Sequence, residues 1–207
     1  MKRSTKYTLA ALISVAGFVA SLALADTKTE SKSTPAVDPQ TAEMMKKAEE
    51  AAAPSAAHKK LEPFVGEWNA EVKMWMSPDA PPTVSKGTAK STWILDGRYV
   101  QEDFSGEMMG KPFKGMSLTG YDNVRQKYRG IWVDDMSTTI VTSEGDVDAA
   151  GKVFTFGGNY ACAMTGEKNK ESTMVYRILS RDKHVFEMYD LAEGKKTKMM
   201  EITYTRK

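Results

Sequence analysis

Cysteine and histidine are scarce in this chain of 207 residues, which has one cysteine, Cys162, and two histidines, His58 and His184. One cysteine excludes an internal disulfide and any zinc site built from several cysteines. Two histidines this far apart in the sequence do not suggest a multi-histidine site, so no metal ion is predicted. Neither sign of charge dominates, since Lys and Arg number 29 and Asp and Glu number 27. The composition is typical of a soluble globular protein.

Signatures of catalysis are missing as well. Two histidines cannot build a convincing Ser-His-Asp or metalloprotease constellation. Gly157 and Gly158 follow a predicted strand but precede no helix, so they do not form a phosphate-binding loop. No catalytic residue is predicted. An enzyme remains an alternative only if two carboxylates embedded in strands reach one cavity.

Residues 1–25 have the pattern of a secretory signal peptide. Lys2, Arg3 and Lys6 precede an apolar run over 8–24, and 23–25 reads Ala-Leu-Ala, the small-x-small pattern of a cleavage site before Asp26. The alternative is an uncleaved membrane anchor. We therefore expect an exported protein, either periplasmic or secreted.

Removing this leader changes the charge balance. It takes away three basic residues and no acidic one, leaving 26 basic and 27 acidic residues and a net charge of −1. Attraction to nucleic acid or to an anionic membrane then has no support, so neither is an expected partner. No prediction of oligomeric state follows.

Residues 26–54 form the second predicted region, a disordered tether followed by a short helix. The stretch 26–40 is rich in Thr, Ser, Lys and Pro, whereas 41–53 is rich in Ala, Met, Glu and Lys. Thr41 is the expected cap and Pro54 ends the helix. Ser55 begins a second turn through Leu61, which Pro63 stops.

From Glu67 onward the hydrophobic period changes from helical to two. Trp68, Ala70 and Val72 share one face of the first predicted strand, over 67–76, and Glu71 lies on the other. Asp96 and Gly97 predict a tight hairpin turn. Short connections throughout favour an all-β domain over 55–207, an antiparallel up-and-down barrel of roughly ten strands preceded by short helical segments. A two-sheet sandwich is the alternative. The further predicted strands are 91–95, 98–104, 113–121, 127–134, 137–144, 152–156, 171–179, 184–191 and 196–206.

Two resemblances agree with this architecture. Gly66, Glu67 and Trp68 resemble the Gly-x-Trp motif of the lipocalin or calycin group, which implies that Gly66 permits a tight start to the strand and that Trp68 closes one end of the barrel. The same resemblance implies that Arg206, from the last strand, lies over Trp68. The second is to the uncharacterised bacterial family catalogued as domain of unknown function 1579, and it covers about residues 55–207. It is carried by LDGR at 95–98, GYDN at 120–123, WVDDMST at 132–138, FEMY at 186–189 and MEITYTR at 200–206.

The calycin resemblance implies an internal cavity for a small, partly apolar ligand. Charged residues within predicted strands are the candidates to face it, because a buried charge needs a partner or a ligand. Arg98 and Glu102 are expected to orient the ligand, with Trp93, Tyr121 and Trp132 as apolar wall. Asp134 and Glu187 complete the predicted ligand-binding set. The alternative function is a structural or interaction module of the cell envelope with a side-chain-filled barrel.

No cofactor is predicted, and haem is the sharpest alternative to that prediction. Some calycin-like barrels bind haem through a histidine near the C-terminus, whereas the last predicted strand here has none. His184 lies one strand earlier, with Met188, Met199 and Met200 as further axial ligands in principle. The 14 methionines would also suit Cu(I), but without a dense cluster they indicate core packing.

Overall fold

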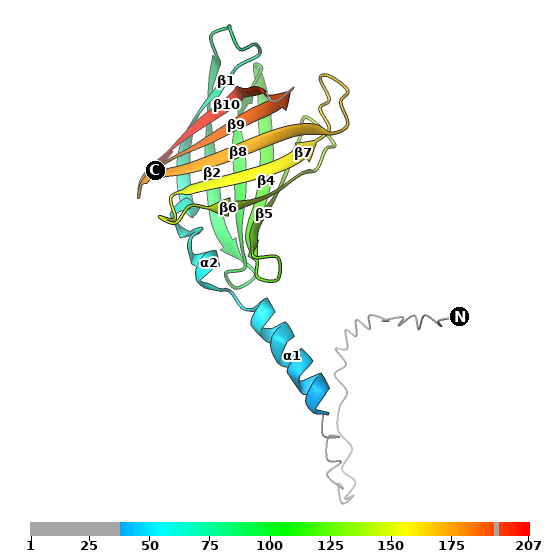
Figure 1. The fold of residues 1–207 in the computed structure, drawn as a ribbon. Coiled ribbons are helices and arrows are strands. Elements are labelled where there is room, and N and C mark those ends of the chain that lie inside the picture. The colour runs from blue at the N-terminus through cyan, green and yellow to red at the C-terminus, as the bar shows by residue number, and fades with distance from the viewer. Residues whose placement is uncertain (1–37, 193–194) are drawn as a thin grey trace, which may run out of the picture. The chain divides into compact units, whose positions relative to one another are not determined.

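The computed structural model describes residues 38–192 and 195–207. The predicted leader, residues 1–25, and the predicted tether up to residue 37 lie outside the described residues. Two α-helices and one 3-10 helix precede ten strands (Figure 1). The elements are α1 (Pro39–Ala52), α2 (Ala56–Lys59), η1 (Glu62–Phe64), β1 (Gly66–Met74), β2 (Thr83–Ile94), β3 (Tyr99–Met108), β4 (Lys111–Asp122), β5 (Lys127–Asp134), β6 (Val141–Val147), β7 (Val153–Tyr160), β8 (Lys170–Ser180), β9 (Lys183–Ala192) and β10 (Lys195–Arg206).

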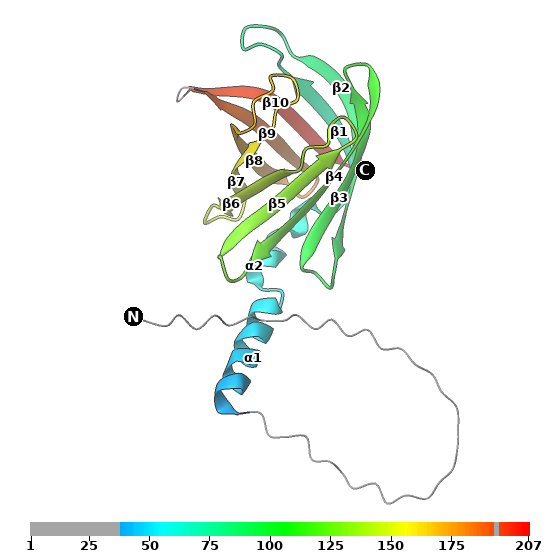
Figure 2. The same cartoon turned by 90° about the vertical axis from the view of Figure 1, so that its right-hand side faces the viewer.

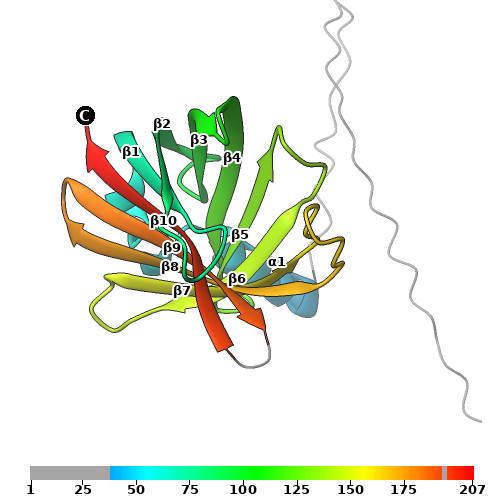
Figure 3. The same ribbon diagram turned by 90° about the horizontal axis from the view of Figure 1, so that it is seen from above.

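The ten strands form one closed antiparallel barrel, in which sequence neighbours pair and β1 pairs with β10. Figure 3 shows the strands arranged around a ring with β1 beside β10. At this seam Trp68 is opposite Arg206, and Met74 is opposite Met200. Closure removes the exposed edges that an open sheet of this length would present. The predicted up-and-down barrel is confirmed, and the sandwich alternative is wrong.

Alternation along each strand separates the interior of the barrel from its outer wall. In β1 the residues Trp68, Ala70 and Val72 are buried, while those between them are exposed. Successive side chains in a strand point to opposite faces, so one face of the sheet can line the interior and the other can meet water. The same rule applies along the other strands, except across the register irregularities at Ile178–Ser180 and Lys198–Met200.

The interior is filled largely by two hydrophobic clusters. The first joins β1, β2 and β10 to β3 and β4, and its buried members are Trp68, Ala70, Val72, Ala89, Phe104, Phe113, Ile202 and Tyr204. The second joins β3, β5, β7 and β8 to the segment before β1, and its buried members are Leu61, Val100, Tyr128, Phe154, Phe156 and Met174.

Residues 55–65, which we call the plug, cover the end of the barrel where β1 begins (Figure 2). Leu61 is buried in the second cluster, and the Phe64 ring packs edge-on against Phe154, Tyr176 and His184. The Tyr128 hydroxyl donates to the carbonyl of Ala57 at 2.9 Å. The plug is therefore joined to the core by apolar packing and by a hydrogen bond.

Helix α1 has no buried residue, and its C-terminal end is hydrogen-bonded to the barrel. The Asn123 amide donates to the carbonyls of Ala51 and Ala53, and Arg98 Nε donates to that of Ala52 at 3.0 Å. These donors satisfy carbonyls that the end of a helix leaves without partners. The helix begins at Pro39, so the expected start at Thr41 was two residues late. No helix in the described part of the chain is long and apolar enough to cross a bilayer.

The turn between β2 and β3 also differs from its prediction. Ile94 pairs with Tyr99, so the connection is the four residues 95–98 and not the two central residues of a tight hairpin. Leu95, Asp96 and Gly97 all have positive φ, which is the reason that the chain reverses over a longer loop. Arg98 therefore lies in the turn and not in a strand.

Candidate ligand cavity

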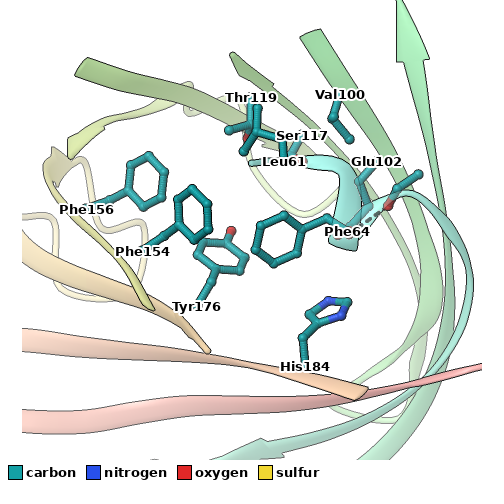
Figure 4. Close-up of a pocket in the computed structure, with 11 residues that line it drawn as sticks. Leu61, Phe64, Val100, Glu102, Ser117, Thr119, Phe154, Phe156, Tyr176 and His184 are labelled. Atoms are coloured by element: carbon teal, nitrogen blue, oxygen red, sulfur yellow. Dashed lines mark hydrogen bonds between the residues drawn. The ribbon is translucent and has the colours of Figure 1, made fainter. Parts of the chain in front are cut away.

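A cavity of about 40 Å³ lies inside the barrel next to the plug. Figure 4 shows its lining side chains converging from the plug and from strands on both sides of the barrel. The apolar members are Leu61, Phe64, Val100, Phe154 and Phe156; the members with polar atoms are Ser91, Glu102, Ser117, Thr119, Tyr176 and His184. The cavity is thus aromatic on one side and carries hydroxyl, carboxyl and imidazole groups on the other.

Glu102 is the one carboxyl group in this lining. It lies at an inward position of β3, between Val100 and Phe104, and lines the cavity. Ser91 Oγ donates to Glu102 Oε2 at 3.2 Å, and the Tyr204 hydroxyl donates to Oε1 at 3.4 Å. Burial raises the pKa of Glu102 to about 7, against the lowering effect of these two hydroxyl groups. The carboxyl group thus titrates near neutral pH.

His184 faces the cavity from β9 and is only 3% exposed. Its ring lies flat on Tyr204, with 4.4 Å between centroids, and edge-on to Trp68 at the same separation. Its Nδ1 is buried and has no hydrogen-bond partner. Burial, and to a smaller extent Arg206, lowers the pKa of His184 to about 3, so the imidazole is neutral at physiological pH.

Tyr204 connects these two groups, because it stacks on His184 and hydrogen-bonds to Glu102. Burial raises the pKa of Tyr204 and of Tyr176 above the ordinary value for tyrosine. Both phenols therefore keep their protons and can act as donors. The described residues that line the cavity include neither lysine nor arginine.

The wall behind His184 is formed by Trp68, Arg206 and Gly66. Trp68 is fully buried, and the guanidinium carbon of Arg206 lies 4.1 Å from the centroid of its ring, where the sequence analysis expected this arginine. Arg206 also donates to the carbonyls of Val65 and Arg181. Gly66 has a φ of 141°, and a Cβ there would collide with the Arg206 guanidinium. The glycine therefore allows the arginine to reach the tryptophan.

Of the seven residues predicted to bind the ligand, the structure places Glu102 in the lining of this cavity. Two others lie near the plug. Trp93 Nε1 donates to Glu62 at 2.7 Å, and Tyr121 packs edge-on against Tyr128 and His58. Trp93 and Tyr121 were expected to face the interior as apolar wall of the cavity. Their side chains contact the plug instead and do not line the cavity.

Trp132 and Asp134 lie toward the other end of the barrel, where β5 ends. Trp132 stacks on Phe113 and donates from Nε1 to Asp134 at 2.9 Å. The other carboxylate oxygen of Asp134 accepts the backbone N–H groups of Met136 and Ser137. Asp134 is therefore occupied in shaping the loop after β5, which corrects its expected role in the cavity.

Arg98 and Glu187 do not face the interior. Arg98 lies in the 95–98 turn, and its side chain donates to the carbonyls of Ala52 and Leu95. Glu187 alternates with two inward core residues, so it points to the outer wall, where Arg177 and Lys198 pair with it. Neither residue lines the cavity, because the turn that holds Arg98 is longer than expected and because the sequence of β9 shows no clearly apolar face.

Sequence reasoning missed most of the polar lining. Ser91, Ser117, Thr119 and Tyr176 occupy inward positions by strand parity, and that parity was the available indication. His184 was considered only as a haem ligand. A cavity of about 40 Å³ is several times smaller than the range of roughly 300–1,000 Å³ typical of cofactor pockets, so this cavity does not accommodate a haem in this conformation.

Comparisons with known proteins place the barrel in a family. A family model described as "Protein of unknown function (DUF1579)" matches residues 53–206. The crystal structure of Rv2717c from M. tuberculosis aligns with a TM-score of 0.57 and 14% identity, over 75% of this chain and 99% of that chain. The structure of a redesigned β-barrel aligns with a TM-score of 0.38 and 11% identity, over the same shares. A search of curated proteins found no match. The likeness to Rv2717c supports the fold alone.

Proposed function

The chain belongs to the DUF1579 family of proteins of unknown function, and we propose that its barrel binds a small, partly apolar molecule in the cavity beside the plug. The observation that carries the proposal is the presence of incompletely satisfied polar groups on side chains that line one cavity. His184 Nδ1 has no partner, and Glu102 accepts only two long hydrogen bonds. Buried polar atoms are normally hydrogen-bonded, so a bound molecule would supply what these groups lack.

The size of the cavity limits what it can hold. A water molecule needs a cavity volume of about 10–15 Å³, and an apolar cavity of about 150 Å³ accommodates benzene. A space of about 40 Å³ therefore suits a molecule of a few non-hydrogen atoms. A larger ligand requires movement of Phe64, the ring of the plug that lines the cavity.

Native mass spectrometry and thermal-shift measurements with a panel of small alcohols, amides, amines and carboxylates test the proposal. Binding should raise the melting temperature, and Ser117→Leu, which fills the cavity, should abolish the response. Ser105→Leu is the matched control, because Ser105 is exposed on the outer wall. The proposal fails if no compound binds, or if the two variants respond alike.

A second candidate function has its own support, since an interior filled largely by side chains is also expected of a structural or interaction module. Helix α1, with no buried residue, precedes the barrel and is available to a partner protein. Deleting residues 26–54 should then abolish capture of a specific partner while leaving the barrel folded. Capture that survives the deletion contradicts this function.

Export is part of the proposal, and the sequence of residues 1–25 supports it. Expression in a bacterium with N-terminal sequencing of the product tests it. We expect a chain that begins at Asp26 outside the cytoplasm. An intact N-terminus on a cytoplasmic product contradicts both export and cleavage.

A further inference from the structure

We infer that the cavity selects a small protonated amine, with its ammonium group between Glu102 and His184. This inference rests on the proposed function and adds the charge and chemical class of the ligand. It is drawn from the charges, the hydrogen-bonding capacity and the aromatic faces of the lining.

The charge of the lining favours a cation over an anion. Glu102 is the only acidic residue among the described lining residues, and no lysine or arginine accompanies it there. The guanidinium of Arg206, behind His184, is occupied by Trp68, by the Asp182 carboxylate and by the carbonyls of Val65 and Arg181. A carboxylate or phosphate in the cavity would thus be buried beside Glu102 without a counter-ion, which is costly.

Glu102 itself lacks a cationic partner. Its two partners are the neutral hydroxyl groups of Ser91 and Tyr204, at 3.2 and 3.4 Å. These distances are long for hydrogen bonds between oxygen atoms, which are usually 2.7–2.8 Å. An ammonium group beside the carboxylate would form a charge-assisted hydrogen bond and would compensate the burial of its charge.

His184 offers the second acceptor. A neutral imidazole has one nitrogen that donates and one that accepts, and the buried Nδ1 has no partner to fix either role. An ammonium group has three N–H donors and no acceptor. The carboxylate of Glu102, the imidazole of His184 and a hydroxyl oxygen of Ser117 or Thr119 match those three donors.

The remaining wall is aromatic. Phe64, Phe154, Phe156 and Tyr176 line the same space, and Figure 4 shows their rings gathered opposite the Glu102 side. Aromatic faces attract ammonium groups and also accommodate short alkyl chains. With the volume of about 40 Å³, this favours ammonium, methylammonium or ethylammonium ions.

The inference carries a pH dependence. The pKa of Glu102 is lowered by the hydroxyl groups of Ser91, from β2, and Tyr204, from β10. It is raised by the Asp103 carboxylate on the same strand. The charge of Glu102 in turn raises the pKa of the Tyr176 phenol on β8. Of these, Glu102 itself is the group that titrates near neutrality, since its pKa is about 7. Alkylammonium ions stay protonated far above that pH, as lysine does up to about 10.4. Loss of the Glu102 proton should therefore make binding about tenfold tighter at pH 8 than at pH 6.

Calorimetric titration of the purified chain at pH 8 with methylammonium chloride tests the inference, with sodium acetate and acetamide, which match each other in size, as the anionic and neutral probes. Methylammonium should bind, and acetate should not. Glu102→Gln should weaken methylammonium binding about ten- to a hundredfold, as expected for loss of a charge-assisted hydrogen bond. Glu107→Gln is the matched control, since Glu107 is exposed on the same strand.

The outcomes separate this inference from the function on which it rests. Binding of acetamide or acetate without methylammonium overturns the amine inference and leaves a ligand-binding barrel. Absence of binding by every probe overturns the amine inference, and the wider panel of compounds described above then decides whether the barrel binds a ligand. If Glu102→Gln does not fold, the tenfold difference between pH 6 and pH 8 in the unsubstituted chain decides; equal affinity at the two pH values overturns the inference.

Discussion

Glu102 is a residue whose burial should be visible in the stability of the whole protein. Its pKa is about 7 in the folded chain against 4.5 ordinarily, so between these values the folded state holds a proton that the unfolded state has lost. Stability should therefore fall as the pH rises from 4.5 to 7, by about 3 kcal/mol from this group. Glu102→Gln should remove that fall, and the variant should exceed the original stability at pH 8 but not at pH 4.5.

Chemical denaturation at the two pH values measures this effect. Glu107→Gln, on the exposed side of β3, should leave the pH dependence unchanged. An identical fall in the original chain and in Glu102→Gln would show that another group is responsible.

Gly66 is the second residue with a measurable consequence. An L side chain at its φ of 141° is strained, and its Cβ would displace Arg206 from Trp68. Gly66→Ala should lower the free energy of unfolding by at least about 2 kcal/mol. Gly157→Ala, whose Cβ would meet nothing within 4 Å, should change it little. Equal effects at the two positions would contradict the role given to the glycine.

At the scale of elements, the plug limits the volume of the cavity inside the barrel. Phe64 is half-buried and packs against three rings of the interior, so Phe64→Ala should cost about 2–3 kcal/mol, below the range for a fully buried phenylalanine. The enlarged cavity should then accept butylammonium, which the original chain should exclude. Phe64→Leu, which retains most of the volume, is the control. Unchanged ligand size in Phe64→Ala would mean that the plug does not limit the cavity.

The strands show which parts of such a structure are predictable from sequence. The alternation of Trp68, Ala70 and Val72 predicted the inward face of β1, because a half-buried strand separates apolar from polar residues. Turn length was not predictable, since three consecutive positive φ values depend on how the strands meet, and Arg98 was misplaced for that reason. Glu102 was assigned to the ligand site, whereas Ser117 and Thr119 look like surface residues until the barrel is closed around them.

At the scale of the whole molecule, closure of the barrel predicts that the backbone amides of all its strands are similarly protected from hydrogen exchange. The backbone of β10 is paired with β1 on one side and β9 on the other, so its amides should exchange with deuterium as slowly as those of β3. Hydrogen-exchange mass spectrometry measures this directly. Amides of α1, which has no buried residue, should exchange fast and provide the internal reference. Fast exchange along both β1 and β10 would show that the seam opens in solution.

The pairing of Trp68 with Arg206 also governs when the protein can fold. These partners are separated by nearly the full length of the domain, so a nascent chain that does not yet include β10 lacks the strand that completes its core. Contacts of such long sequence separation form slowly. Newly made chains should therefore stay open until β10 has been synthesised, and chaperones can bind the exposed apolar surface during that interval.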